Sequence, residues 1–360
     1  MNVRIVVGMS GGVDSSLVAA LLKNQGHDVI GVTLRLYDYK QSLKQTSDDK
    51  KHCHPDSFIH GAQKVCDDLQ VPHHVMDRRD FFQERIVDSF TQSYRAGKTP
   101  LPCVTCNRDV KTSALYDIMK DLGAEALATG HYVRRIDVGD IAQMHQGTDV
   151  RRDQSFFLFA LTEKQMNVMH FPLGGYSKQE TRDQAEKLGL SVAQTPASQD
   201  LCFIADRSYR SLFKENPGPI QDETGHVLGQ HRGIEHYTVG QRQGLGLGGH
   251  HAEPMYVIGL DAQHNAVIVG PRDRLARTIV HLNQVNWLAR DLCSGDEEQS
   301  TYVVSVKMRS SSIALPATVT IAWHNRTAKV TLESPDYSIS PGQACVFYQG
   351  TRLLGGGWII

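Results

Sequence analysis

The stretch that decides the fold is Ser10-Gly11-Gly12-Val13-Asp14-Ser15. It directly follows a β-branched run at residues 3–7, and leucines at positions 17, 21 and 22 continue the chain with helical spacing. A second β-branched run at residues 29–34 begins after a break at Gly26. A strand, a glycine turn, a helix and another strand in this order predict the first unit of an α/β fold.

The alternation of strands and helices continues beyond this unit. The sequence predicts helices over residues 62–69 and 82–94, and strands over 73–76 and 126–129. Strands that alternate with helices favour a doubly wound parallel sheet. The polar segment 37–55 lacks periodicity and is predicted to be a surface loop.

The predicted secondary structure changes after about residue 205. Glycine-rich turns replace the helix signals through residues 225–249, and short β-rich runs separated by turn residues follow from about residue 278. Such runs predict a small antiparallel sandwich or barrel. We therefore expect three domains: an α/β domain at 1–205, a small central domain at 206–275 and a C-terminal β-domain at 276–360.

The glycine turn has the chemistry of a phosphate site. Gly11 and Gly12 let the backbone approach an anion, the helix-start amides point at it, and Ser10 and Ser15 add hydroxyl groups. The loop matches neither the lysine-containing nucleotide loop nor the dinucleotide fingerprint, so amides rather than a lysine are expected to hold the anion. Asp14 beside a phosphate predicts a divalent cation, most simply Mg²⁺. The alternative is a tight turn of small residues without a ligand.

Two of the seven cysteines lie in chemically informative surroundings. Cys106 follows a proline-stiffened loop and precedes a helix expected near Arg108, where terminal amides would stabilise a thiolate. Cys202 follows a turn, just before the helix signals give way to glycine-rich turns near residue 205. An odd number of cysteines in a chain of 360 residues indicates free thiols rather than structural disulfides.

Composition excludes several classes of protein. With 40% hydrophobic and 21% charged residues, the chain is neither disordered nor fibrous. A formal net charge of −1 provides no global field for a polyanion or a membrane. We expect a cytoplasmic protein, because no apolar run approaches the roughly 20 residues of a membrane span and no signal-peptide pattern is present.

The loop resembles the pyrophosphatase loop of enzymes that split ATP into AMP and pyrophosphate. Together with the cysteine motifs, the chain is similar over nearly its full length to the tRNA-specific 2-thiouridylases, which place sulfur at C2 of the wobble uridine. The motifs that carry this resemblance are Gly8-Met9 with the loop, Thr99-Pro100 to Asn107, Ala128 to Tyr132, Arg152 to Leu158, Leu201 to Ile204, Tyr237 to Gly246 and Pro341-Gly342-Gln343. The resemblance implies an adenine nucleotide α-hydrolase-like first domain and a C-terminal antiparallel β-barrel.

The resemblance also implies the reaction and the roles of two thiols. ATP adenylates the C2 oxygen, so that AMP becomes the leaving group. Cys202 matches the cysteine that carries the persulfide, and Cys106 matches the nucleophile. Either sulfide or the persulfide itself attacks C2, and both routes leave a transient Cys106–Cys202 disulfide for reduction.

The resemblance assigns the remaining contacts residue by residue. The positions that match ATP contacts are Gly8, Met9, Ser10, Gly11, Gly12, Val13, Asp14, Ser15, Leu34 and Gly130. The positions that match tRNA contacts are Leu101, Pro102, Cys103, His131, Arg152, Asp153, Gln154, Arg309, Ser310 and Gln343.

The implied partners are tRNAs for Lys, Glu and Gln and a sulfur donor, either a cysteine desulfurase or a sulfur-relay protein. A monomer without membrane attachment is expected. Residues 78–135 contain ten Lys and Arg but only seven Asp and Glu, so this segment carries a positive surplus. Attraction for tRNA is therefore expected to be local and sensitive to salt.

One departure from the family leaves alternatives open. The family commonly carries an acidic residue where this chain has Cys103, so any acid or base role of that position is in doubt. The resulting Cys103-x-x-Cys106 could, with Cys53 or Cys202, bind zinc or an iron-sulfur cluster, as in other tRNA thiolases. A small-molecule synthetase that uses the same ATP loop, and a non-catalytic nucleotide-sensing or RNA-binding module, are further alternatives.

Overall fold

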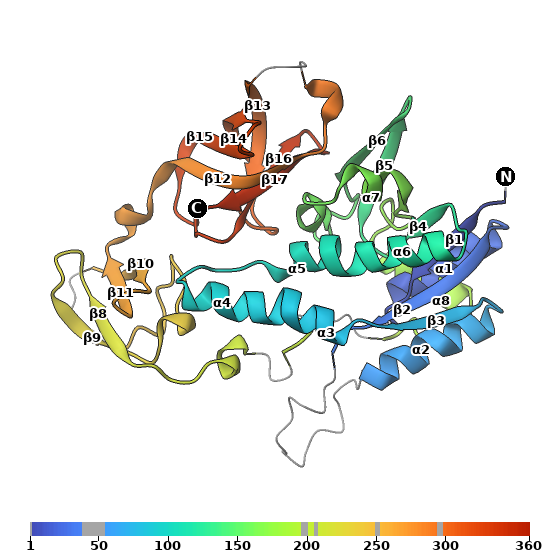
Figure 1. Cartoon of the computed structure of the whole chain (residues 1–360), viewed down its shortest axis with the longest axis horizontal. Helices are drawn as coiled ribbons and strands as arrows, with labels where there is room; N and C mark the ends of the chain where they lie inside the picture. Colours follow the sequence, from blue (N-terminus) through green and yellow to red (C-terminus); the bar gives the residue numbers. More distant parts are fainter. Residues whose placement is uncertain (1, 38–54, 196–200, 205–207, 249–252, 294–297) are drawn as a thin grey trace, which may run out of the picture. The chain divides into compact units, whose positions relative to one another are not determined.

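The computed structural model describes residues 2–37, 55–195, 201–204, 208–248, 253–293 and 298–360 (Figure 1). The chain forms two compact units. The first comprises residues 1–87, 103–207 and 351–353, and the second comprises 88–102, 208–350 and 354–360. Most of the loop predicted at 37–55, and Cys53 with it, lies outside the described residues.

The first unit is built on a five-stranded sheet in the order β3-β2-β1-β4-β7. Every neighbouring pair in this sheet is parallel, which confirms the predicted α/β fold. The strands are β1 (Arg4–Gly8), β2 (Asp28–Arg35), β3 (His73–Asp77), β4 (Ala126–Ala128) and β7 (Met169–His170).

Helices cover both faces of this sheet, because side chains alternate along a strand. Ile5 and Val7 of β1 are buried in a core shared with residues of α1 (Val13–Asn24) and α2 (Pro55–Asp68). On the opposite face, Gly8 lies against Leu115, where an added Cβ would be 3.0 Å from the leucine Cδ1 atom. Leu115 belongs to α6 (Ser113–Asp121), which therefore packs next to the strand that leads into the glycine turn.

Two helical runs contain π-helical stretches. The helix predicted at 82–94 is α3 (Arg79–Phe82), η2 (Gln83–Asp88) and α4 (Ser89–Arg95), of which η2 is π-helical. The cysteine loop begins a second run, α5 (Pro102–Thr105), η3 (Cys106–Thr112) and α6, of which η3 is π-helical. The other elements of the first unit are β5 (Val133–Val138), β6 (Ile141–Gln146), η4 (Ser155–Leu158), α7 (Glu163–Val168) and α8 (Lys178–Lys187).

The second unit contains a four-stranded sheet in the order β10-β11-β8-β9. These strands are β8 (Gly218–Gln221), β9 (Val227–His231), β10 (Tyr256–Asp261) and β11 (Ala266–Gly270). Helix α4 belongs to this unit because the ring of Tyr94 stacks on that of Tyr209, with 4.6 Å between centroids. Since the two units interleave along the chain, the domain boundaries near 205 and 275 stay a prediction.

The C-terminal part of the second unit is a closed antiparallel barrel, as predicted. Six strands follow one another in the order β12-β15-β14-β13-β16-β17, and β17 pairs back to β12. The strands are β12 (Arg277–Trp287), β13 (Gln299–Lys307), β14 (Leu315–Ala322), β15 (Thr327–Asp336), β16 (Ala344–Gln349) and β17 (Arg352–Ile359). Short 3₁₀ turns lie at η5 (Tyr209–Leu212), η6 (Ile234–His236), η7 (Arg272–Leu275) and η8 (Arg290–Leu292).

Among the described residues, no helix is both long enough and apolar enough to cross a bilayer.

Candidate active site: a phosphate loop and a group of thiols

The glycine turn lies between β1 and α1, at the carboxyl edge of the parallel sheet. Ser15 organises it: its Oγ accepts a hydrogen bond from the Ser10 amide at 3.1 Å and lies 3.2 Å from the Ser10 hydroxyl. Gly12 caps α1 in an extended conformation, so the first-turn amides of the helix have no partner within the helix. The turn therefore presents amides and the exposed Ser10 at a helix N-terminus, which suits a phosphate.

Position 11 of this turn accepts only glycine. Its φ of +74° lies in the left-handed region, and a Cβ there would be 2.3 Å from the carbonyl oxygen of Phe58. Both the backbone conformation and the close approach of α2 therefore require glycine.

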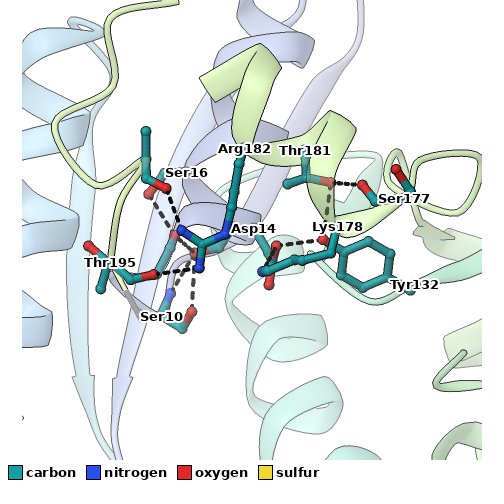
Figure 2. Close-up of polar contacts among 12 residues, drawn as sticks. Ser10, Asp14, Ser16, Tyr132, Ser177, Lys178, Thr181, Arg182 and Thr195 are labelled. Carbon is teal, nitrogen blue, oxygen red and sulfur yellow. Dashed lines mark hydrogen bonds and ion pairs between the residues drawn. The ribbon is translucent and has the colours of Figure 1, made fainter. Parts of the chain in front are cut away.

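Asp14, in the first turn of α1, is bound by two side chains from distant parts of the sequence (Figure 2). Its Oδ1 accepts a hydrogen bond from the Tyr132 hydroxyl at 2.8 Å and forms an ion pair with the Lys178 Nζ at 2.6 Å. The sequence predicted amides rather than a lysine at this loop, and no motif in it indicated Tyr132 or Lys178 as a partner of Asp14. The loop thus has a lysine within reach, supplied by α8.

The start of α8 fixes the position of Lys178. Ser177 caps the helix, and a reciprocal capping box joins its backbone and side chain to those of Glu180. The hydroxyl of Thr181, one turn into the helix, lies 3.0 Å from the Tyr132 hydroxyl. The capped first turn of α8 therefore holds Lys178 next to Asp14 (Figure 2).

Cys106 is not at a helix N-terminus, which corrects the sequence-based expectation. The helical run begins four residues earlier, at Pro102, so Cys106 lies inside it. Its side chain is buried with Phe82, Ile86 and Val110, and this burial raises the pKa of the thiol. Helix-terminal amides therefore do not stabilise a thiolate at Cys106.

The Lys111 ammonium group interacts with three thiols of the first unit. It lowers the pKa of Cys103, Cys106 and Cys202. Desolvation is the larger effect at the buried Cys106 and raises its pKa, whereas Cys103 and Cys202 have exposed side chains. All three are free thiols in the structure. Sequence analysis did not single out Lys111.

The turn after β4 joins the phosphate loop to the thiols. A Cβ on Gly130 would lie 2.9 Å from the Cβ of Asp14 and 3.0 Å from the Ser15 amide nitrogen, so the turn packs directly on the loop. The next residue, His131, receives an electrostatic influence from Lys111. Residues 129–132 thus contact the phosphate loop and lie within the electrostatic range of Lys111, in one compact unit.

The other first-unit residues that match ATP or tRNA contacts of the family fall into two groups. Some form hydrogen bonds within the protein, and others are exposed or half-buried. Asp153 accepts hydrogen bonds from the amides of Gly147 and Ser155, and the Gln154 Oε1 accepts one from the Tyr132 amide. These two side chains shape the segment before η4. Arg152 is exposed, and Leu34 is half-buried near the end of β2.

The remaining assigned residues belong to the second unit or begin α5. Arg309 and Ser310 are exposed after β13. The Gln343 Nε2 donates a hydrogen bond to the carbonyl oxygen of Thr99 at 3.0 Å. Leu101 and Pro102 are respectively half-buried and buried before Cys103. The contacts of these residues with tRNA stay a prediction.

The residues around the loop fit a cation that is held mainly by phosphate. Asp14 offers its second oxygen, because Lys178 and Tyr132 both bind to Oδ1. Within the described ranges, no cluster of three or more His, Cys, Asp and Glu could hold a metal ion. Mg²⁺ commonly binds through one carboxylate together with substrate phosphates, so the loop suits it. A metal held by the thiols would need a ligand such as Cys53, outside the described residues.

His131 is expected to remain neutral throughout the physiological pH range. Burial, and then Lys111, lower the pKa of its imidazole to about 3. The unfolded chain therefore binds a proton that the folded chain does not, and this residue's contribution to the free energy of unfolding declines as pH falls from about 6.5 towards 3. In ¹³C-histidine NMR spectra, the signal that disappears in His131→Gln should keep its neutral shift at pH 5. A titration midpoint near 6.5 would contradict the placement of this ring.

Fold and site together define a nucleotide-binding α/β protein whose first unit also holds a group of free thiols. Residues 3–206 match a family model described as the tRNA methyl transferase HUP domain. Residues 210–271 match a tRNA methyl transferase PRC-barrel domain, and residues 277–359 match an aminomethyltransferase β-barrel domain.

The tRNA-specific 2-thiouridylase MnmA of Rhodospirillum centenum is 45% identical over 371 residues, which cover 100% of this chain and 92% of that protein. The protein of the same name from Orientia tsutsugamushi is 45% identical, with 99% and 95% covered. The one from Paramagnetospirillum magneticum is 46% identical, also with 99% and 95% covered. The chain belongs to the family of tRNA-specific 2-thiouridylases.

Proposed function

We propose that this protein uses ATP to replace the C2 oxygen of the wobble uridine of tRNA with sulfur. The observation that carries the proposal is the turn at residues 129–132. It packs through Gly130 on the phosphate loop, and at His131 it lies within the electrostatic range of Lys111, whose charge also acts on the thiols. One unit thus holds the two functions that the reaction couples, cleavage of ATP and delivery of sulfur.

Activation begins with ATP on the glycine turn. The C2 oxygen of uridine attacks the α-phosphorus, the bond from this phosphorus to the bridging oxygen breaks, and pyrophosphate leaves with the electron pair. The turn amides, Ser10 and Lys178 bind the departing phosphates. The residues proposed to contact ATP are Gly8, Met9, Ser10, Gly11, Gly12, Val13, Asp14, Ser15, Leu34 and Gly130.

Sulfur transfer uses Cys202 as a persulfide and Cys106 as a thiolate. When the terminal persulfide sulfur attacks C2, the C2–O bond breaks and AMP leaves. The Cys106 thiolate attacks the Sγ of Cys202, so the persulfide S–S bond breaks and its sulfur stays on C2. If Cys106 attacks first, the released sulfide attacks C2 instead. Both orders form a Cys106–Cys202 disulfide, which an external thiol must reduce.

Mg²⁺ is proposed as the cation of the ATP complex. Asp14 would hold it from the protein side, and the ion would neutralise charge on the phosphates. Lys178 then keeps Asp14 oriented towards the loop, since its ammonium group lies 2.6 Å from one carboxylate oxygen.

The tRNA is proposed to be bound by residues of both units. Those of the first unit or its boundary are Leu101, Pro102, Cys103, His131, Arg152, Asp153 and Gln154, and those of the second are Arg309, Ser310 and Gln343. The proposed substrates are tRNAs for Lys, Glu and Gln. A cysteine desulfurase or a relay protein supplies the sulfur, and the enzyme acts as a cytoplasmic monomer.

Release of AMP distinguishes this function from its competitors. We expect ATP to be split to AMP and pyrophosphate at a rate that depends on unmodified tRNA when a persulfide donor is present. A small-molecule synthetase would exchange pyrophosphate into ATP without tRNA. A non-catalytic binding module would form no AMP under any of these conditions, and either result would contradict the proposal.

Replacing Lys178 with methionine is expected to weaken ATP binding. The variant removes the ammonium group beside the phosphates and leaves Asp14 without its ion pair. We expect the KM for ATP to rise about tenfold, or ~1.4 kcal/mol, in an assay of AMP release. Lys64→Met is the matched control, because Lys64 pairs with Asp68 at 2.8 Å on the exposed side of α2. An unchanged KM in Lys178→Met would contradict this role.

A further inference from the structure

The π-helical stretch η3 places Cys106 and Lys111 on one side of the helical run. In an α-helix with 3.6 residues per turn, positions five apart point about 140° away from each other. A π-helix joins residues i and i+5 by its hydrogen bonds, so Lys111 lies one turn above Cys106. Cys103 lies one turn before Cys106. The widened turn therefore brings the ammonium group to the side that carries both thiols.

The electrostatic contacts of Lys111 agree with this geometry. Cys106, Cys202 and Cys103, in this order of strength, favour the charged form of the lysine and raise its pKa, against the desolvation that lowers it. Cys202 comes from a segment about 90 residues further along the chain. The positive charge of Lys111 thus acts on both thiols of the proposed reaction.

The other charged groups near Cys106 do not replace this lysine. Asp109 raises the pKa of the Cys106 thiol, but its carboxylate is paired with Arg85 at 2.7 Å and also with Arg108. His131 is uncharged at neutral pH. Among the described residues, Lys111 forms no ion pair with a carboxylate, so its charge is available to a thiolate.

We infer that Lys111 is a positioning residue of sulfur transfer, whose ammonium group stabilises the Cys106 thiolate that attacks the persulfide on Cys202. Cys106 loses its proton to solvent, and the thiolate electron pair forms the bond to the Sγ of Cys202. The pair of the broken persulfide bond stays with the departing sulfur. This inference rests on the proposed function, since it gives Lys111 a part in that reaction.

The test compares Lys111→Met with the wild-type full-length enzyme. Iodoacetamide alkylation is followed against pH, and mass spectrometry resolves each cysteine. The midpoint for Cys106 should rise by about one pH unit or more, which is a tenfold loss of thiolate at a fixed pH below the midpoint. Lys111→Arg keeps the positive charge, so its Cys106 midpoint should lie close to that of the wild type. Lys120→Met is the control, because this lysine lies over the Tyr116 ring on the exposed side of α6 and should leave the midpoint unchanged.

A second readout separates electrostatics from folding. If Lys111 supplies charge, thiolation by Lys111→Met should recover as pH rises, whereas a misfolded variant would stay inactive. An unchanged Cys106 midpoint, or a shifted midpoint with normal thiolation at neutral pH, would overturn the inference. The failure of the proposed function is distinct: wild-type enzyme would form no 2-thiouridine, while the midpoint shift would still be measurable without tRNA.

Discussion

Cys202→Ala should form no 2-thiouridine while it still releases pyrophosphate from ATP in the presence of tRNA. The alanine cannot carry a persulfide, but it leaves the glycine turn and its partners untouched. Cys106→Ser should be equally inactive in thiolation, because a serine hydroxyl stays protonated at neutral pH and is a far weaker nucleophile than a thiolate. Nucleoside mass spectrometry of the product tRNA measures both effects, which we expect to exceed a thousandfold.

The matched control for the cysteine variants is Cys293→Ala. Cys293 is also an exposed free thiol, but it lies in the second unit after η8. Its replacement should leave 2-thiouridine formation unchanged. Normal 2-thiouridine in either Cys106→Ser or Cys202→Ala would contradict the roles assigned to these two cysteines. Loss of activity in Cys293→Ala would show that the loss is not specific to Cys106 and Cys202.

Gly11→Ala should abolish ATP cleavage. The new Cβ would stand 2.3 Å from the Phe58 carbonyl oxygen, so either the glycine turn or the start of α2 must move. Because the phosphate-binding amides lie in that turn, we expect AMP release to fall by at least a hundredfold. A left-handed φ adds a backbone penalty of about 1–2 kcal/mol for any residue with a Cβ.

Gly26→Ala separates the collision at Gly11 from the backbone penalty. Gly26 has a φ of +88°, but an added Cβ would meet nothing within 4 Å. This variant should lose about 1–2 kcal/mol of stability and keep full activity. If both variants lost AMP release to the same degree, strain rather than the shape of the phosphate turn would explain Gly11.

Much of the fold could be predicted because its signals are local. The β-branched run of β1, the glycine turn and the leucines of α1 are adjacent in sequence, and side-chain alternation distinguishes the two faces of the sheet. The barrel follows from short β-rich runs between turns. The allocation of α4 to the second unit depends on the stacking of Tyr94 on Tyr209, a contact between distant residues that no local pattern reports.

The missing parts of the site also depend on distant contacts. Lys178 reaches Asp14 across 164 positions in the chain, so the loop motif could not include it. One signal was available: Lys178 stands in the first turn of a capped helix, where the helix dipole disfavours a cation. Lys111 gave no such signal, because helical periodicity does not place positions 106 and 111 on one side, and only the π-helical turn does.

The most direct test of the account is transfer of labelled sulfur to tRNA by the full-length protein. The enzyme is incubated with unmodified tRNA, ATP and a desulfurase loaded with ³⁵S-persulfide, and AMP is counted beside the label. We predict label at C2 of the wobble uridine, formed with one AMP per sulfur, and none when ATP is omitted or when Cys202→Ala is used. Sulfur transfer without ATP, or labelled tRNA from the Cys202→Ala variant, would contradict the account.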